Sequence, residues 1–417
     1  MKSLKLNNDF IKSVATLVTG TILAQIVVFA LSPIISRLYS PEETAYFSVY
    51  ARIIILASTL ATARFEFALA LPKRNEHAFT LYRLIVRLVL ISFIISILIS
   101  CFYVLFGLKN IKDSFIYFMI PVGLVPLCMM NIGNAWSMRQ GQFKEISKLR
   151  MVHSISMNLS NVLFGVLGFG YQGLILGYVV GVSIPGAWFT KKYHLLKLKY
   201  KDFTNINRRK IIRSTYIDFP KVNLPHALTD MIRELLIVFF ILLFYNKSVL
   251  GSYDFSFKML KLPLTIIGSA IGQVYFQKIA IKRNNGESLS KITLQTIKNL
   301  FLLSVIPFSI LFFYGQELFC YVFGKNWELA GKYSEIMAPW LMMNLIVSPI
   351  SHLPAVIGKL KSFFWVGFLG SVLAIGLFLF PYFNNNLDFM LLLKYINYSQ
   401  TIFLFFVLIW FMRLSKK

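Results

Sequence analysis

Long apolar segments alternate with short polar ones along almost the whole chain. The apolar segments have about twenty residues each, the length at which a helix crosses the ~30 Å hydrocarbon core of a bilayer. Their expected limits are 11–36, 44–70, 84–106, 115–136, 152–170, 172–190, 222–245, 249–276, 297–315, 334–357, 363–383 and 388–412. This pattern predicts an all-α polytopic membrane protein with about 12 transmembrane helices.

Composition agrees with this prediction. Of the 417 residues, 57% are hydrophobic and 14% are charged, whereas soluble domains carry roughly 25% charged residues. A cytosolic enzyme, a secreted disulfide scaffold and a DNA-binding module are therefore excluded. Cys101, Cys128 and Cys320 lie in apolar or near-apolar stretches without paired spacing, so we expect three unpaired thiols.

The formal net charge of +26 follows from the predicted topology. Most of the Lys and Arg residues fall at the two termini and in one of the two alternating sets of loops. Cytoplasmic loops are the ones enriched in these residues, so both termini are expected in the cytoplasm. Because topology explains most of the charge, we expect no nucleic-acid partner.

A basic polar stretch at 191–221 divides the chain into two parts with six spans each. The predicted domains are an N-terminal six-helix bundle at 1–190, a cytoplasmic linker at 191–221 and a C-terminal six-helix bundle at 222–417. The segments YSPEETAYFSVYAR (39–52) and YNKSVLGSYDFSFK (245–258) occupy equivalent places in the two parts. Repeated bundles are typical of transporters whose substrate site lies near the membrane midplane. We therefore expect two pseudo-symmetric bundles around a central cavity.

Polar side chains recur along one face of four of these spans. Span one carries Thr21, Gln25, Ser32 and Ser36. Span two carries Ser48, Arg52, Thr59, Thr62 and Glu66; span seven carries Asn223, His226, Asp230, Arg233 and Glu234; span eight carries Asp254, Lys258, Lys261, Thr265, Ser269 and Gln273. An ionised side chain at the bilayer centre costs about 2.5–3.5 kcal/mol, so these faces are expected to line a hydrated interior. The alternative is a static network of local ion pairs, Asp230–Arg233–Glu234 and Asp254–Lys258.

No cofactor or metal is expected. Gly168-Phe-Gly170-Tyr-Gln-Gly173 matches G-x-G-x-x-G literally, but it lies between two spans and lacks a preceding soluble strand. The sequence contains neither a phosphate-binding lysine loop nor a pair of histidines with the spacing of metal ligands.

Several segments resemble the polysaccharide (O-antigen) flippases of the multidrug/oligosaccharidyl-lipid/polysaccharide (MOP) exporter superfamily, whose fold is MATE-like. The segments in the first half are 31–53, 61–78 and 173–181, and those in the second half are 219–232, 251–277 and 323–351. Ala45 departs from the family pattern, which more often has glycine at this position. The resemblance covers most of the chain in consistent order.

The resemblance implies a flippase, not an enzyme, in the bacterial inner membrane. Its substrate would be an undecaprenyl-pyrophosphate-linked oligosaccharide, moved by alternating access of the two bundles. The implied partners are this lipid-linked substrate, membrane lipids, a polysaccharide polymerase and a chain-length regulator, with the flippase itself a monomer.

Candidate site residues follow from the chemistry of such a substrate. Guanidinium and ammonium groups suit pyrophosphate, and the cavity candidates are Arg52, Arg64, Arg233, Lys258, Lys261, Asn223, His226 and Gln273. Carboxylates in a partly dry cavity suit ion or proton coupling, and the candidates are Glu66, Asp230, Glu234 and Asp254. Tyr46, Tyr50, Tyr253, Phe255 and Phe257 suit either stacking on sugar rings or an ordinary aromatic belt at the membrane interface.

Two other functions remain open at this stage. A multidrug or cation antiporter of the same fold would favour an acidic cavity, but basic and acidic candidates are nearly balanced here. A membrane O-antigen polymerase or glycosyltransferase would require a large external loop or an acidic catalytic cluster. The largest expected outward loop is at about 315–334, and Glu317, Glu328 and Glu335 are scattered along it.

Overall fold

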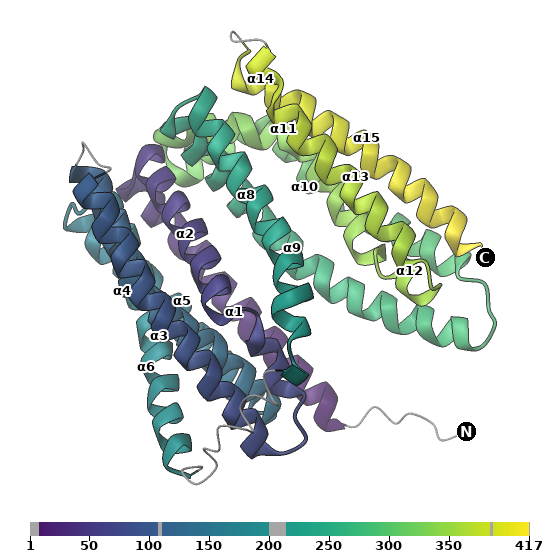
Figure 1. Cartoon of the computed structure of the whole chain (residues 1–417). Helices are drawn as coiled ribbons and strands as arrows, with labels where there is room; N and C mark the ends of the chain where they lie inside the picture. Colours follow the sequence, from purple (N-terminus) through teal and green to yellow (C-terminus); the bar gives the residue numbers. More distant parts are fainter. Residues whose placement is uncertain (1–7, 107–110, 200–213, 384–386, 417) are drawn as a thin grey trace. The chain divides into compact units, whose positions relative to one another are not determined.

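The computed structural model describes residues 8–106, 111–199, 214–383 and 387–416, and these ranges contain helices and no β-strand (Figure 1). The helices of the first half are α1 (Asn8–Leu38), α2 (Pro41–Thr62), η1 (Phe65–Ala70), α3 (Asn75–Phe106), α4 (Ile111–Arg139), α5 (Phe143–Val166) and α6 (Tyr171–Lys199). Those of the second half are η2 (Phe219–Asn223), α8 (Leu224–Phe244), α9 (Lys247–Asn284), α10 (Ser290–Phe323), η3 (Lys325–Trp327), α11 (Glu328–Ile350), α12 (Leu353–Val356), α13 (Leu360–Phe378), α14 (Phe380–Phe383) and α15 (Phe389–Ser415).

Ten of the described helices are long and apolar enough to cross a membrane. Helices α5 and α8, which the sequence pattern also counted as spans, are not among the ten. Helix α8 is almost as long as α2, but it carries three charged residues, Asp230, Arg233 and Glu234. The prediction of an all-α, multi-pass membrane protein is confirmed. The cytoplasmic location of the termini stays a prediction.

The chain forms two compact units. Unit 1 comprises Met1–Tyr39 and Tyr46–Glu234, and unit 2 comprises Ser40–Ala45 and Leu235–Lys417. Within unit 1, α4 packs on α3 and α6, and α6 packs on α5. Within unit 2, α11 packs on α10 and α15, and α15 packs on α13. This is the same pattern, with α10, α11, α13 and α15 in the places of α3, α4, α5 and α6. The order of helices inside the two units therefore agrees with the repeat in the sequence.

The repeated segments begin their helices in the same way. The backbone N–H of Ser40 donates to Oε2 of Glu43 at 2.7 Å, and the N–H of Glu43 donates to the Ser40 hydroxyl at 3.3 Å. This reciprocal pair is a capping box, which satisfies backbone donors at a helix start. At the equivalent position of the second repeat, the Asn246 side chain accepts a hydrogen bond from the Val249 N–H at 2.9 Å and caps α9.

In unit 2, the first turn of α9 packs tightly against the start of α2. A Cβ atom at Gly251 would lie 1.7 Å from the carbonyl oxygen of Pro41, so no residue other than glycine fits there without movement of the backbone. The equivalent residue of the first repeat, Ala45, is 1% exposed. The small residues that mark the repeat therefore occupy tightly packed positions at both helix starts.

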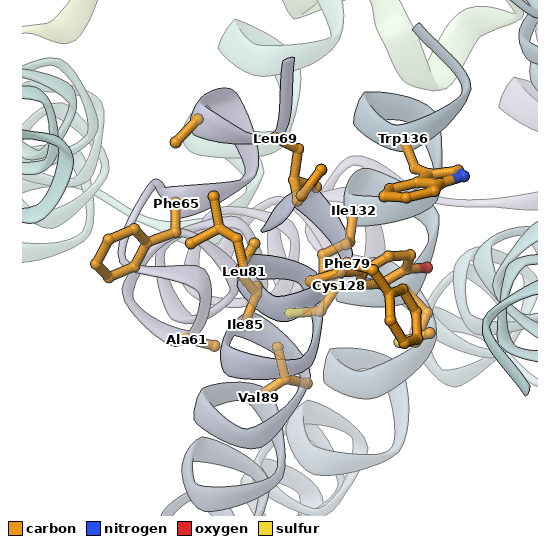
Figure 2. Close-up of a cluster of buried hydrophobic side chains, with 14 of the residues drawn as sticks. Ala61, Phe65, Leu69, Phe79, Leu81, Ile85, Val89, Cys128, Ile132 and Trp136 are labelled. Carbon is orange, nitrogen blue, oxygen red and sulfur yellow. The ribbon is translucent and has the colours of Figure 1, made fainter. Parts of the chain in front are cut away.

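The core of unit 1 joins α2, η1, α3 and α4 (Figure 2). Its buried members include Phe65 and Leu69 of η1, Phe79 and Ile85 of α3, and Trp136 of α4. The rings of Phe79 and Trp136 meet edge to face at a centroid distance of 6.2 Å. This packing fixes η1, the segment that follows α2 in the chain.

The sequence prediction of one continuous span over 44–70 is wrong. Helix α2 ends at Thr62, and Ala63 and Arg64 have φ angles of 48° and 61°. Two successive non-glycine residues in the left-handed region end an α-helix. Arg64 and Glu66 therefore do not continue the helical face that carries Arg52.

Candidate functional site

The polar residues of α9 lie on the surface of unit 2. Five of them are exposed: Lys258, Lys261, Thr265, Ser269 and Gln273. The core-facing side of α9 instead presents buried residues such as Met259, Leu264 and Tyr275. We call the five exposed residues the α9 polar row. Helix α9 is long enough to cross a membrane, and ionised groups are costly in hydrocarbon. The lysines of the α9 polar row therefore require contact with water.

Asp254 lies apart from the α9 polar row. It is 7% exposed and lies one turn before Lys258. The two side chains interact electrostatically. The sequence placed Asp254 on the same face as the lysines, but the structure buries it among the first turns of α9. Its burial leaves Lys258 and Lys261 as the accessible charges of α9 between Asp254 and Gln273.

The predicted polar residues of α8 are also accessible. Asn223, just before α8, and His226, Asp230 and Glu234 within it are exposed, and Arg233 is half-buried. Nη2 of Arg233 lies 3.8 Å from Oδ1 of Asp230, whose side chain is 65% exposed. The local pairing that the static-network alternative requires is therefore present for these two residues. An exposed pair of this kind contributes little to stability, so it does not explain why the charges are there.

Three candidate residues from two distant segments of the chain meet in unit 1. Nε of Arg64 donates to Oδ1 of Asn223 at 3.0 Å, and Nη1 of Arg64 lies 4.0 Å from Oε1 of Glu66. Glu66 is 8% exposed, and its Oε2 atom has no hydrogen-bond partner among the described residues. The left-handed turn at Ala63 and Arg64 is what directs the guanidinium toward the start of α8.

Arg52 lies in the middle of α2 and is half-buried. Its Nη1 donates to the backbone carbonyl of Ser48 at 3.3 Å, one turn earlier. Arg52 and Arg64 are separated by the end of α2, so the structure gives unit 1 two distinct cationic positions.

The structure separates the aromatic candidates into two groups. Tyr50 is fully buried and donates its hydroxyl to the carbonyl of Met119 at 3.0 Å, and Phe255 packs on Trp327 with a centroid distance of 3.9 Å. These two residues are parts of cores. The other three, Tyr46, Tyr253 and Phe257, are half-buried. Tyr46 stacks on Tyr171 with a centroid distance of 4.6 Å, and Tyr253 and Phe257 lie on α9 beside the α9 polar row.

An ion-pair cluster that the sequence pattern did not predict lies in unit 1. Lys192 of α6 contacts Glu145 of α5, and Glu145 also accepts hydrogen bonds at 2.8 Å from both Ser137 and Trp188. Although partial burial alone would raise the pKa of Glu145, these hydrogen bonds hold it below its ordinary value. The cluster ties α4, α5 and α6 together. Its residues come from three separate segments, so no local spacing could have predicted it.

A groove of about 610 Å³ lies between α4 and α6 of unit 1, on walls that are largely apolar. Val125 and Pro126 line one side, and Gly186, Ala187 and Lys191 are among the residues of the other. None of the predicted site residues lines it. Among the described residues, no group of three or more His, Cys, Asp or Glu side chains comes together as a metal site would require.

The helices have the fold of the MOP superfamily of transporters. An inward-facing multidrug resistance MATE family transporter of this superfamily matches with a TM-score of 0.64 at 16% identity, over 94% of this chain and 94% of that chain. The lipid II flippase MurJ in an inward closed conformation matches with a TM-score of 0.67 at 15% identity, over 96% and 89%. A MOP superfamily transporter from Pyrococcus furiosus matches with a TM-score of 0.59 at 15% identity, over 97% and 96%.

The sequence itself identifies the family. The profile of the polysaccharide biosynthesis protein family matches residues 73–331. This match covers more than half of the chain, so the chain belongs to that family. No curated protein matches the sequence. The match to a polysaccharide biosynthesis family and the fold of MOP superfamily transporters thus confirm the resemblance at the level of family and fold.

Proposed function

We propose that this protein is a flippase that moves an undecaprenyl-pyrophosphate-linked oligosaccharide across the bacterial inner membrane by alternating access. The α9 polar row carries the proposal. Two accessible lysines and three hydroxyl or amide side chains on one membrane-length helix suit a substrate whose head group is anionic and rich in hydroxyls. The polysaccharide biosynthesis family and the fold shared with a lipid II flippase support the same substrate class.

The proposed roles follow from charge and exposure. Arg52, Arg64, Lys258 and Lys261 attract the pyrophosphate, because cations form charge-assisted hydrogen bonds with phosphate oxygens. Asn223, His226, Gln273 and Arg233 provide further polar contacts. Glu66, Asp230 and Glu234 are proposed to bind the coupling ion or proton. Buried Asp254 is proposed to hold Lys258 in place rather than to exchange an ion itself.

Reconstituted transport tests this function. Proteoliposomes that contain the full chain should move undecaprenyl-pyrophosphate-linked oligosaccharide from one leaflet to the other, and protein-free vesicles should not. The leaflet distribution is measured with a membrane-impermeant enzyme that cleaves or labels the sugar. Flipping of this lipid supports the proposal. Efflux of a cationic dye without lipid flipping would favour a cation antiporter of the same fold, and sugar polymerisation would favour an enzyme.

A further inference from the structure

Three aromatic rings and one lysine form a cluster on the accessible side of unit 2. The rings of Tyr253 and Phe257 lie 6.2 Å apart with an angle of 10° between their planes. The rings of Phe257 and Trp340 lie 5.9 Å apart with an angle of 13°. Nζ of Lys261 lies 5.0 Å from the centroid of Phe257. We call Tyr253, Phe257 and Trp340 the Phe257 cluster.

This geometry differs from that of the aromatic core nearby. In the core of unit 2, Phe255 meets Phe323 at 90° and lies against the fully buried Trp327. The members of the Phe257 cluster are instead nearly parallel and half-buried. Tyr253 also meets the buried Phe389 at an angle of 86° and a centroid distance of 6.0 Å, so the set joins the core at this end. Trp340 lies at the other end, and no hydrogen bond to its Nε1 is present in the described part of the chain. The cluster thus offers apolar faces and a polar donor at one place.

Flat aromatic faces are chemically suited to sugar rings. An aromatic face carries the negative part of the ring quadrupole, and the C–H groups on one face of a pyranose carry partial positive charge. The hydroxyl and amide groups around the sugar edge can accept a hydrogen bond from an indole N–H. A half-buried tryptophan that packs on Phe257, whose ring contacts a lysine, therefore suits a sugar that is attached to a phosphate.

The order of residues along α9 matches the order of groups in such a ligand. Tyr253 and Phe257 lie in the first third of α9, and Lys258 and Lys261 follow within a turn. Over one turn a helix rises about 5.4 Å, which is close to the length of one sugar ring. A sugar on the aromatic cluster would therefore place the neighbouring pyrophosphate beside the lysines.

We propose that the Phe257 cluster is a saccharide subsite that holds the sugar next to the pyrophosphate, while Lys261 and Lys258 bind the pyrophosphate itself. The inference rests on the proposed function and adds to it the residues that recognise sugar rather than lipid. Phe257 is the centre of the subsite, because its ring contacts both flanking rings and the Lys261 ammonium.

Two probes separate sugar recognition from phosphate recognition: undecaprenyl pyrophosphate, and undecaprenyl pyrophosphate that carries one N-acetylglucosamine. Affinities for the purified full-length protein are measured by titration in native mass spectrometry. The wild-type protein should bind the sugar-bearing probe more tightly. Trp340→Ala should weaken binding of that probe about tenfold, the scale of one aromatic stacking contact, and leave binding of undecaprenyl pyrophosphate unchanged. Lys261→Gln should weaken both.

Two further variants keep the test decisive. Trp365→Ala removes an exposed tryptophan of unit 2, 64% exposed on α13, and should change neither affinity. Trp340→Phe retains a ring but loses the N–H, and it should weaken only the sugar-bearing probe, even where Trp340→Ala fails to fold. Equal effects of Trp340→Phe on both probes, or no effect on the sugar-bearing probe, would overturn the subsite but leave the proposed function intact. If the wild-type protein bound neither probe, the proposed function and the subsite would both be wrong.

Discussion

Replacing Lys258 or Arg52 by alanine should lower the rate of lipid-linked oligosaccharide flipping by about 100-fold, equal to ~2.7 kcal/mol of lost stabilisation. The two residues occupy equivalent positions of the sequence repeat, and both are cations on membrane-length helices. A pyrophosphate that leaves water requires cationic partners, and the loss of one charged partner costs about 2–5 kcal/mol when the other stays desolvated. Rates are measured in proteoliposomes, and surface polysaccharide is measured in cells that depend on this protein.

Matched variants distinguish a role in transport from a general effect of charge. Arg37→Ala removes a guanidinium that, like Arg52, donates to a carbonyl one turn earlier in its own helix. Lys359→Ala removes an exposed cation of unit 2 outside the α9 polar row. Both controls should transport at near wild-type rates. If Lys258→Ala and Arg52→Ala transported as well as these controls while present in the membrane at equal amounts, the assigned roles would be wrong.

The second large effect concerns the fold. Gly251→Val should destabilise the protein by about 3 kcal/mol or more, because even a Cβ at this position would lie 1.7 Å from the Pro41 carbonyl oxygen. Side chains can move aside when a core is overfilled, but here the obstacle is the backbone of α2. For a unit of this size, we expect a melting temperature in detergent lowered by about 6–12 °C, together with a low yield of folded protein.

Gly367→Val provides the control for this variant. Gly367 also lies inside a helix of unit 2, but a Cβ there would meet no atom within 4 Å. Its melting temperature should stay within about 2 °C of the wild-type value, because glycine and valine differ little in helix propensity. A melting temperature of Gly251→Val equal to that of Gly367→Val would contradict the close approach of α2 and α9.

The helical architecture could be predicted from sequence because its main signal is local. Apolar runs mark the spans. The repeated segments indicate equivalent positions in the two halves, and in the structure these are helix starts capped at Ser40 and Asn246. The break after Thr62 was missed because no glycine or proline marks it. Ala63 and Arg64 adopt left-handed angles that the packing of Phe65 and Leu69 maintains.

The candidate site could be predicted only in part. The spacing of polar residues predicted the accessible lysines of α9, because residues three or four positions apart lie on the same face of a helix. It could not find the contact between Arg64 and Asn223, which are 159 residues apart, nor the burial of Asp254, which depends on how α9 packs in unit 2. Trp340 was missed because it lies on α11, and only the packing of α11 on α9 brings it to Phe257.

Water access along α9 is the most direct test of the account. In a background without Cys101, Cys128 and Cys320, Ser269→Cys and Val274→Cys are compared by reaction with a charged, membrane-impermeant thiol reagent in native membranes. Both positions are exposed in unit 2, but they lie about 140° apart around the helix. We predict rapid labelling of Ser269→Cys and little labelling of Val274→Cys. Equal labelling of the two cysteines, or protection of Ser269→Cys, would contradict the hydrated polar face.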